Sequence, residues 1–112
     1  MQISVSEFGT AGKRLTLSGK LDIAGADKID LPLAAIAGAR QNVVIDMGGV
    51  DFIASIGLRH LVMAAKAIAR GNGRLVLLNP TQFVTEVLLT SSLQQILPIA
   101  RSEDEADAVL RG

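Results

Sequence analysis

The sequence predicts an α/β protein with a largely parallel sheet that begins with an antiparallel hairpin. Three observations indicate this fold class. Two short alternating segments stand at the N-terminus, strand-like and helix-like segments then alternate to the C-terminus, and turn residues separate them. Strands that alternate with helices are typical of right-handed crossovers onto a parallel sheet. We therefore expect a mixed sheet of four to five strands with about four helices, formed by residues 1–112 as a single domain.

The hairpin is predicted from two segments whose side chains alternate between apolar and polar types. Residues 2–8 show this pattern, and residues 13–20 repeat it with Leu15 and Leu17 as the apolar positions. Alternation with a period of two is typical of a half-buried strand. A glycine-containing turn at residues 9–12 separates the segments, so we expect them to pair antiparallel.

A first helix is expected at about residues 26–38, because apolar residues recur there at helical spacing. These residues are Ile29, Leu33, Ile36 and Ala37. Pro32 lies inside the segment, where proline removes a backbone donor and crowds the preceding turn. The helix is therefore either kinked at Pro32, or begins with Asp30 as its cap and Pro32 in its first turn.

A buried central strand is expected at residues 42–47, a continuous apolar run rich in β-branched residues, and Gly48-Gly49 is expected to end it. A second helix is expected at about residues 56–71, before the stop signal Gly71-Asn72-Gly73. One face of that helix carries an apolar stripe, formed by Leu58, Leu61, Val62, Ala65, Ile68 and Ala69.

The C-terminal third is expected to add two strands and two helices. Residues 74–78 are expected to form a buried strand, and Thr81 to cap a helix that continues to about Leu89. Four apolar residues of that helix should face inward: Phe83, Val84, Val87 and Leu88. Residues 95–100 are expected to form a short last strand, which Pro98 confines to an edge or a bulge.

The last helix has a recognisable start. Ser102 and Glu105 have the spacing of a capping box, in which each side chain bonds to the backbone N–H at the other position. The helix that follows should carry Ala106, Val109 and Leu110 on one side.

The composition excludes several classes of function. Eleven basic residues balance eleven acidic ones, so no strong field indicates nucleic acid or an anionic membrane as a partner. The chain has no cysteine and one histidine, which excludes disulfides and cysteine nucleophiles and argues against a zinc site. The N-terminus lacks a signal-peptide pattern, and the apolar runs fall short of the roughly 18 residues of a membrane span. We expect a soluble, cytoplasmic protein without a cofactor or membrane insertion.

The strand ends are also candidate positions for a nucleotide-binding loop or a metal site. The segment "DMGGVDFIASIG" places glycines between a strand and a helix, but it lacks the lysine and the glycine spacing of nucleotide-binding loops. A simple turn is the better interpretation. Asp22, Asp46 and Asp51 fall at strand ends or in the following loops. Each of them either caps a helix or faces solvent in a loop, or the carboxylates form a Mg²⁺-binding cluster.

Ser55 comes immediately before the apolar stripe of the second helix. A hydroxyl there can accept a hydrogen bond from an unpaired N–H of the first turn, so Ser55 is expected to cap the helix. A helix N-terminus also stabilises a phosphate, which makes Ser55 a candidate for phosphorylation. His60 lies five residues further on and is expected to be an ordinary surface or boundary residue. A serine hydrolase would therefore lack its base.

The segment "VVIDMGGVDFIASIGLRHLVMAAK" resembles the signature of STAS domains, in particular of bacterial anti-sigma factor antagonists. The family pattern is a strand ending in an acidic residue, a short loop, an aromatic-aliphatic pair, and usually Asp, Ser, a small residue, Gly and Leu. Two positions depart from it, since Ala54 replaces the aspartate and Ile56 replaces a small or hydroxyl residue. Upstream, "LTLSGKLDIAGA" resembles the family's strand and turn, with Asp22 at the acidic position. The resemblance covers nearly the whole chain.

The resemblance implies a STAS-type fold and a non-enzymatic function in partner switching. In the family, an anti-sigma factor that is also a serine kinase phosphorylates the serine at the Ser55 position. The unphosphorylated form binds that kinase, and a PP2C-type phosphatase resets the system. The resemblance thus implies Ser55 as the phosphoacceptor and a partner-binding surface formed by Asp22, Ser55, Ile56, Gly57, Leu58 and Arg59. We expect a monomer or a weak dimer.

The departure at Ala54 keeps a second function open. Loss of the carboxylate removes a contact to the kinase or a local effect on phosphorylation. Some STAS domains are binding modules in transporters, sensors or other complexes and never use a phosphate switch. The alternative is therefore a phosphorylation-independent STAS module that regulates a transporter or another signalling complex.

Overall fold

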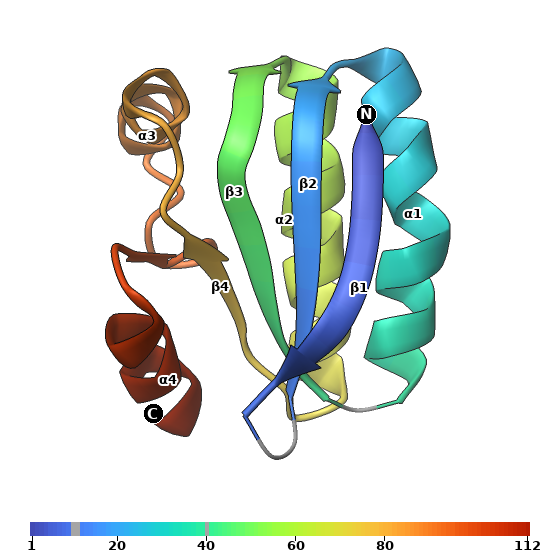
Figure 1. Cartoon of the computed structure of the whole chain (residues 1–112), viewed down its shortest axis with the longest axis vertical. Helices are drawn as coiled ribbons and strands as arrows, with labels where there is room; N and C mark the ends of the chain where they lie inside the picture. The colour runs from blue at the N-terminus through green and yellow to red at the C-terminus, as the bar shows by residue number, and fades with distance from the viewer. Residues whose placement is uncertain (10–11, 40) are drawn as a thin grey trace.

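The computed structural model describes residues 1–9, 12–39 and 41–112, which form one five-stranded sheet with helices on both faces (Figure 1). The elements in chain order are β1 (Gln2–Phe8), β2 (Gly12–Leu21), α1 (Ile23–Gly38), β3 (Asn42–Ile53), α2 (Ser55–Arg70), β4 (Leu75–Leu78), α3 (Gln82–Thr90), β5 (Ile99–Ala100) and α4 (Glu103–Arg111). The alternation of strands and helices predicted from the sequence is confirmed. No helix in these ranges has the length and apolar character that a membrane crossing needs.

The strands lie in the sheet in chain order, β1-β2-β3-β4-β5. β1 and β2 pair antiparallel, from Gln2 opposite Ser18 to Phe8 opposite Gly12, and the later pairs are parallel. The N-terminal hairpin is thus confirmed, although part of its expected turn, residues 10 and 11, lies outside the described residues. Because β2, β3 and β4 are parallel, their carboxyl ends meet at one edge of the sheet.

β3 continues through Gly48-Gly49 to Ile53, so the prediction that these glycines end the strand is wrong. The pairing of β3 with β2 shifts register at two points in this region, which gives β3 extra residues relative to its neighbour. Such bulges bend a strand and often contain glycine. Asp46 supports the bend, since its Oδ1 accepts a hydrogen bond from Gly48 N at 3.1 Å. The glycines therefore bend the strand without stopping it.

α1 begins at Ile23, earlier than either start predicted from the sequence. Asp22 caps it, with Oδ1 accepting a hydrogen bond from Gly25 N at 3.0 Å. The start at Asp30 is wrong, because Pro32 lies inside the helix. Buried residues on both sides of the proline hold the helix on the sheet, and this packing offsets the missing hydrogen bond. They are Ile29, Leu33 and Ile36.

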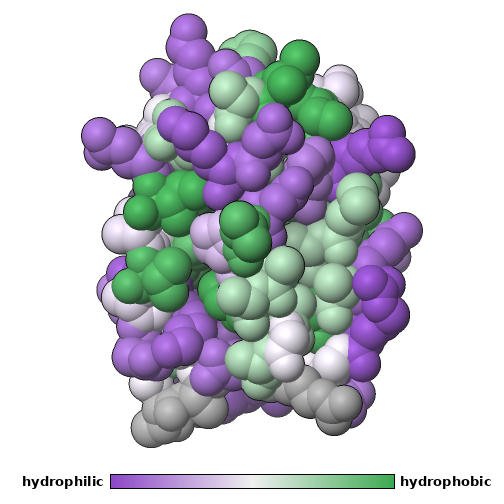
Figure 2. All heavy atoms as spheres, turned by 90° about the vertical axis from the view of Figure 1, so that its right-hand side faces the viewer, coloured by the Kyte–Doolittle hydropathy of each residue, from purple (hydrophilic) through white to green (hydrophobic). Residues whose placement is uncertain are grey.

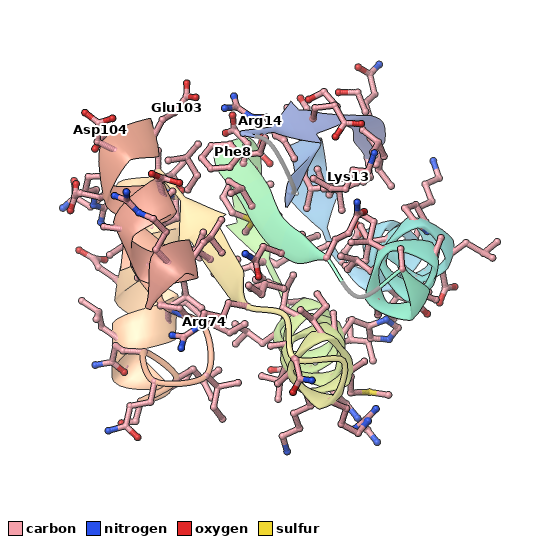
Figure 3. The ribbon with its side chains drawn as sticks, turned by 90° about the horizontal axis from the view of Figure 1, so that it is seen from below. Phe8, Lys13, Arg14, Arg74, Glu103 and Asp104 are labelled. Atoms are coloured by element: carbon pink, nitrogen blue, oxygen red, sulfur yellow. The ribbon has the colours of Figure 1, made fainter. Side chains whose placement is uncertain are left out.

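Two cores lie on opposite faces of the sheet. α1 and α2 cover one face and enclose the larger core, whereas α4 packs on the other face (Figure 1, Figure 3). The smaller core under α4 consists of Phe8, Val44, Val76, Leu78, Ala100, Ala106 and Leu110. Of the predicted stripe of α2, Leu61, Ala65 and Ile68 are buried, whereas Ala69 is exposed.

α3 follows the prediction except at Phe83. Thr81 caps the helix, with Oγ1 accepting a hydrogen bond from Val84 N at 3.3 Å, and Val84 and Leu88 are buried. Phe83 is 48% exposed, so its expected inward orientation is wrong. Its ring stacks on Phe52 of β3, with ring centroids 6.3 Å apart. Contact with an aromatic neighbour thus replaces burial in the core.

The last strand is shorter than the expected residues 95–100, whereas the last helix starts as expected. β5 contains only Ile99–Ala100, because Pro98 before it has no N–H for the sheet. Ser102 Oγ accepts a hydrogen bond from Glu105 N at 3.1 Å, as a capping box requires. The carboxylate of Glu105 accepts from Arg101 N, one residue upstream of the expected donor.

Candidate functional site

The candidate site lies at the junction between β3 and α2. Ala54 has an extended backbone, with φ −96° and ψ 166°, and precedes the first helical residue, Ser55. Leu58 N donates to Ala54 O at 3.1 Å, so the helical hydrogen bonds start from Ala54. The prediction that Ser55 caps α2 is therefore wrong by one position, and the helix has no side-chain cap. Ser55 is the first residue of the helix and is exposed.

The end of β2 brings Asp22 next to this junction. Leu21 pairs with Ile53 in the sheet, and Leu21 O accepts a hydrogen bond from Ala54 N at 3.0 Å. Asp22 and Ser55 directly follow the two residues that this hydrogen bond joins. α1 and α2 therefore begin side by side, with the half-buried Asp22 beside the exposed Ser55.

Gly57 is buried where the first turn of α2 meets the end of β2. A Cβ atom at this position would lie 2.6 Å from Leu21 O and 2.8 Å from Leu21 Cγ, which is closer than non-bonded atoms approach. A residue without a side chain is therefore required for α2 to start against β2. Through this close approach, Gly57 holds Ser55 near Asp22.

The other residues of the predicted partner-binding surface differ in exposure. Arg59 is exposed, whereas Ile56 and Leu58 are half-buried, and Leu58 packs against the larger core. Ser55 and Arg59 lie four residues apart and share one face of the helix. We call Asp22, Ser55, Ile56 and Arg59 the Ser55 face, because these four residues offer accessible atoms around the serine.

Phe52 of β3 and Phe83 of α3 form an exposed aromatic pair, which the sequence predicted only in part. Phe52 is 40% exposed, three residues before Ser55, and its ring is nearly parallel to that of Phe83, at 16°. The aromatic-aliphatic pair before the serine gave a signal for Phe52. The helical spacing of apolar residues in α3 predicted an inward orientation for Phe83, whereas its side chain is exposed. Exposed aromatic side chains are frequent anchors in protein interfaces.

The acidic residues at the strand ends do not gather into a metal site. Asp22 caps α1, Asp46 supports the bend of β3, and Asp51 is exposed. Among the residues that the structure describes, no three His, Cys, Asp or Glu side chains are grouped so that they could hold a metal ion. Local structural functions therefore account for Asp22 and Asp46.

His60 joins the two helices that cover the larger core. Its Nδ1 lies 2.6 Å from Asp30 Oδ1 of α1, and the side chain is half-buried. This contact gives the imidazole a structural function at the helix pair, as expected for a boundary residue.

The chain is similar to known STAS domains and anti-sigma factor antagonists. The sequence profile of the STAS domain matches residues 6–106. A Bordetella bronchiseptica protein named "Putative anti-sigma factor antagonist BtrV" is 34% identical over 96 residues, which cover 85% of this chain and 83% of that protein.

Solved structures agree with this match. An anti-sigma factor antagonist from Mycobacterium paratuberculosis is 18% identical and has a TM-score of 0.86, over 99% of this chain and 94% of that one. SpoIIAA of Bacillus in its phosphorylated form is 19% identical, with a TM-score of 0.73 over 96% and 99% of the two chains. At these identities the structures establish a common fold.

Proposed function

Because this chain belongs to the STAS domain family, we propose that it is an anti-sigma factor antagonist that acts by partner switching in the cytoplasm. The unphosphorylated Ser55 face binds an anti-sigma factor that is also a serine kinase, and phosphorylation of Ser55 releases this partner. A PP2C-type phosphatase then restores the binding form. The observation that carries the proposal is the position of Ser55, exposed as the first residue of α2 and beside Asp22.

The start of α2 is chemically suited to a reversible phosphate. The N–H groups of a first helical turn have no intrahelical partner, and the positive end of the helix dipole stabilises an anion. A phosphate would add roughly −1.5 to −2 charges to a face that already carries Asp22. An unpaired charge buried against a partner costs about 3–5 kcal/mol. That cost lowers affinity about a hundredfold or more without a conformational change.

Ala54 favours a second candidate function. This residue replaces the aspartate usual in the family and leaves α2 without a side-chain cap. A kinase that recognises its substrate through the carboxylate usual at this position would phosphorylate Ser55 poorly. The second candidate is therefore a phosphorylation-independent STAS module that regulates a transporter or another signalling complex.

The two functions are separated by substitutions at Ser55. The variants Ser55→Ala and Ser55→Asp would be titrated against the anti-sigma factor kinase of the same organism by calorimetry. We expect Ser55→Ala to bind like the wild type and Ser55→Asp to lose about a hundredfold or more in affinity, because a desolvated negative charge opposes the contact. Equal binding by both variants would contradict the switch and favour the module.

A matched control comes from another exposed serine. Ser6 pairs with Arg14 near the opposite end of the sheet from Leu21, so Ser6→Asp adds the same charge away from the Ser55 face. It should bind the kinase like the wild type. Mass spectrometry after incubation with the kinase and ATP should then place one phosphate on Ser55, and a PP2C-type phosphatase should remove it.

A further inference from the structure

The outer surface of α1 is unusually apolar for a helix at the surface. Apart from three charged residues, its exposed positions hold Ile23, Ala24, Leu31, Ala34, Ala35 and Gly38, and Leu31 is 82% exposed. Figure 2 views this side of the molecule and shows apolar side chains gathered across the middle of the face. A helix that is apolar on all sides is normally buried, and exposed apolar patches mark interaction surfaces.

A groove between α1 and α2 continues this apolar surface. Its lining consists of Asp30, Leu33, Ala34 and Ala37 from α1, and His60, Met63, Ala64 and Ala67 from α2, and its volume is about 240 Å³. Small alanine side chains leave room for a partner to approach the helices. Met63, at its outer rim, is 58% exposed.

The two helices carry opposite charges beside the groove. On α1, Asp27, Asp30 and Lys28 are exposed, so acidic residues outnumber the basic one, and Asp30 also contacts His60 of α2. On α2, Arg59, Lys66 and Arg70 are exposed and recur with Met63 at spacings of three and four residues, so they form one ridge. The surface is therefore complementary to a copy of itself, and the balanced net charge of the chain adds no overall repulsion.

We propose that this face, formed by the outer sides of α1 and α2, binds a second copy of the chain around a two-fold axis parallel to the helices. Such an axis places α1 of one protomer over α2 of the other and repeats each contact twice. The two surfaces share Arg59, but the inference does not depend on the function proposed for Ser55.

The register between the helices matches the charges across this axis. α1 and α2 run in the same direction, since both connect parallel strands of one sheet, and Asp30 lies beside His60. Residues of α1 are therefore level with those about 30 positions later in α2. In the dimer, Asp27 then lies within about one turn of Arg59 of the partner subunit, and Leu31 within about one turn of Met63 of the partner subunit, which is within reach of these long side chains. An acidic and a basic residue thus meet at one level, and the exposed apolar side chains Leu31 and Met63 meet about one turn further along the helices.

The test is the sedimentation velocity of the protein from micromolar to millimolar concentration. The wild type should shift from monomer to dimer. Leu31→Lys and Met63→Glu should each weaken the dimer about tenfold or more, because each charge is buried twice in a two-fold interface. Leu89→Lys is the matched control, since Leu89 is 48% exposed on α3, away from this face, and should leave the dimer unchanged. Circular dichroism confirms that each variant is folded.

A charge exchange tests the register. Asp27→Arg and Arg59→Asp should each weaken the dimer, and the double variant should recover most of the lost affinity, because the pair is then restored with its signs reversed. A wild type that stays monomeric at all concentrations would overturn the proposal and leave the face to a different partner. So would species larger than a dimer, or Leu31→Lys and Met63→Glu variants that dimerise like the wild type.

Discussion

At the residue scale, the geometry of the Ser55 face depends on Gly57, because α2 starts too close to β2 at this position for any side chain to fit. Gly57 lies directly against Leu21 O, and this contact sets how close α2 begins to Asp22. The serine that carries the proposed switch is therefore positioned by a residue that is itself buried. A change at Gly57 should disturb the site without removing any of its polar atoms.

Gly57→Ala should lower the free energy of unfolding by about 1–3 kcal/mol, because the added methyl group must push α2 away from β2. Gly38→Ala is the matched control, since a Cβ at Gly38 meets nothing within 4 Å. There the same substitution should raise stability by at most about 0.5 kcal/mol, because Gly38 is the last helical residue, where helix propensity contributes less than in the interior. Urea unfolding of both variants measures the difference, and equal changes would contradict the close approach.

The sequence placed Ser55 correctly at the start of a helix but could not decide which residue caps it. Serine is a better cap than alanine in isolation, and this preference favoured Ser55. The pairing of Leu21 with Ile53 and the hydrogen bond from Ala54 N to Leu21 O are long-range contacts. They hold Ala54 in an extended conformation and so move the helix start, which local spacing cannot reveal.

At the element scale, the starts of the helices divide into capped and uncapped. Asp22, Thr81 and Ser102 each accept a backbone hydrogen bond at the start of α1, α3 and α4, and α2 has no such bond. Thr81 and Ser102 were predicted as helix caps, because Thr81 follows a turn and Ser102 has the spacing of a capping box with Glu105. A helix cap was one of the interpretations of Asp22, but the first helix was predicted to start at about residue 26 or at Asp30, downstream of its observed start at Ile23.

Caps at α1 and α2 should respond in opposite directions to substitution. Asp22→Ala should lower stability by about 1 kcal/mol, because Gly25 N loses its partner. Ala54→Asp should raise stability by about 0.5–1 kcal/mol, because Ala54 already has an extended backbone that suits a cap. Thermal unfolding measures both changes. Ala54→Asn is the control, since it caps without a charge beside Asp22, and a loss of stability in both Ala54 variants would contradict the assignment.

At the scale of the whole molecule, the sheet separates two cores of unequal size. The order of elements predicted the sheet and the helices on it, because alternation of strands and helices permits few topologies. The unequal covering of the two faces was not predictable, since α4 buries only Ala106 and Leu110 and its sequence pattern does not say which face it covers. Arg14 helps to attach it, with a salt bridge to Glu103 at 2.6 Å and a position 5.4 Å from the centre of the Phe8 ring (Figure 3).

This unequal packing predicts that α4 opens on its own before the sheet unfolds. An exposed salt bridge contributes at most about 1 kcal/mol, and two buried side chains add little to hold the helix. Amide hydrogen exchange should therefore show lower opening free energies in α4 than in β3. The free energies are compared between the wild type and two variants, Leu77→Ala in the larger core and Leu110→Ala under α4.

The two variants distinguish local from global opening. Leu77 is fully buried, so Leu77→Ala should destabilise the whole fold by about 2–5 kcal/mol and speed exchange in β3. It should leave exchange in α4 unchanged, because the larger core stays intact when α4 detaches. Leu110→Ala should speed exchange in both elements, since its contacts are lost in the locally open and in the unfolded state alike. If Leu77→Ala speeds exchange in α4 as much as in β3, the helix opens only with the whole molecule, and the smaller core is then an integral part of one cooperative unit.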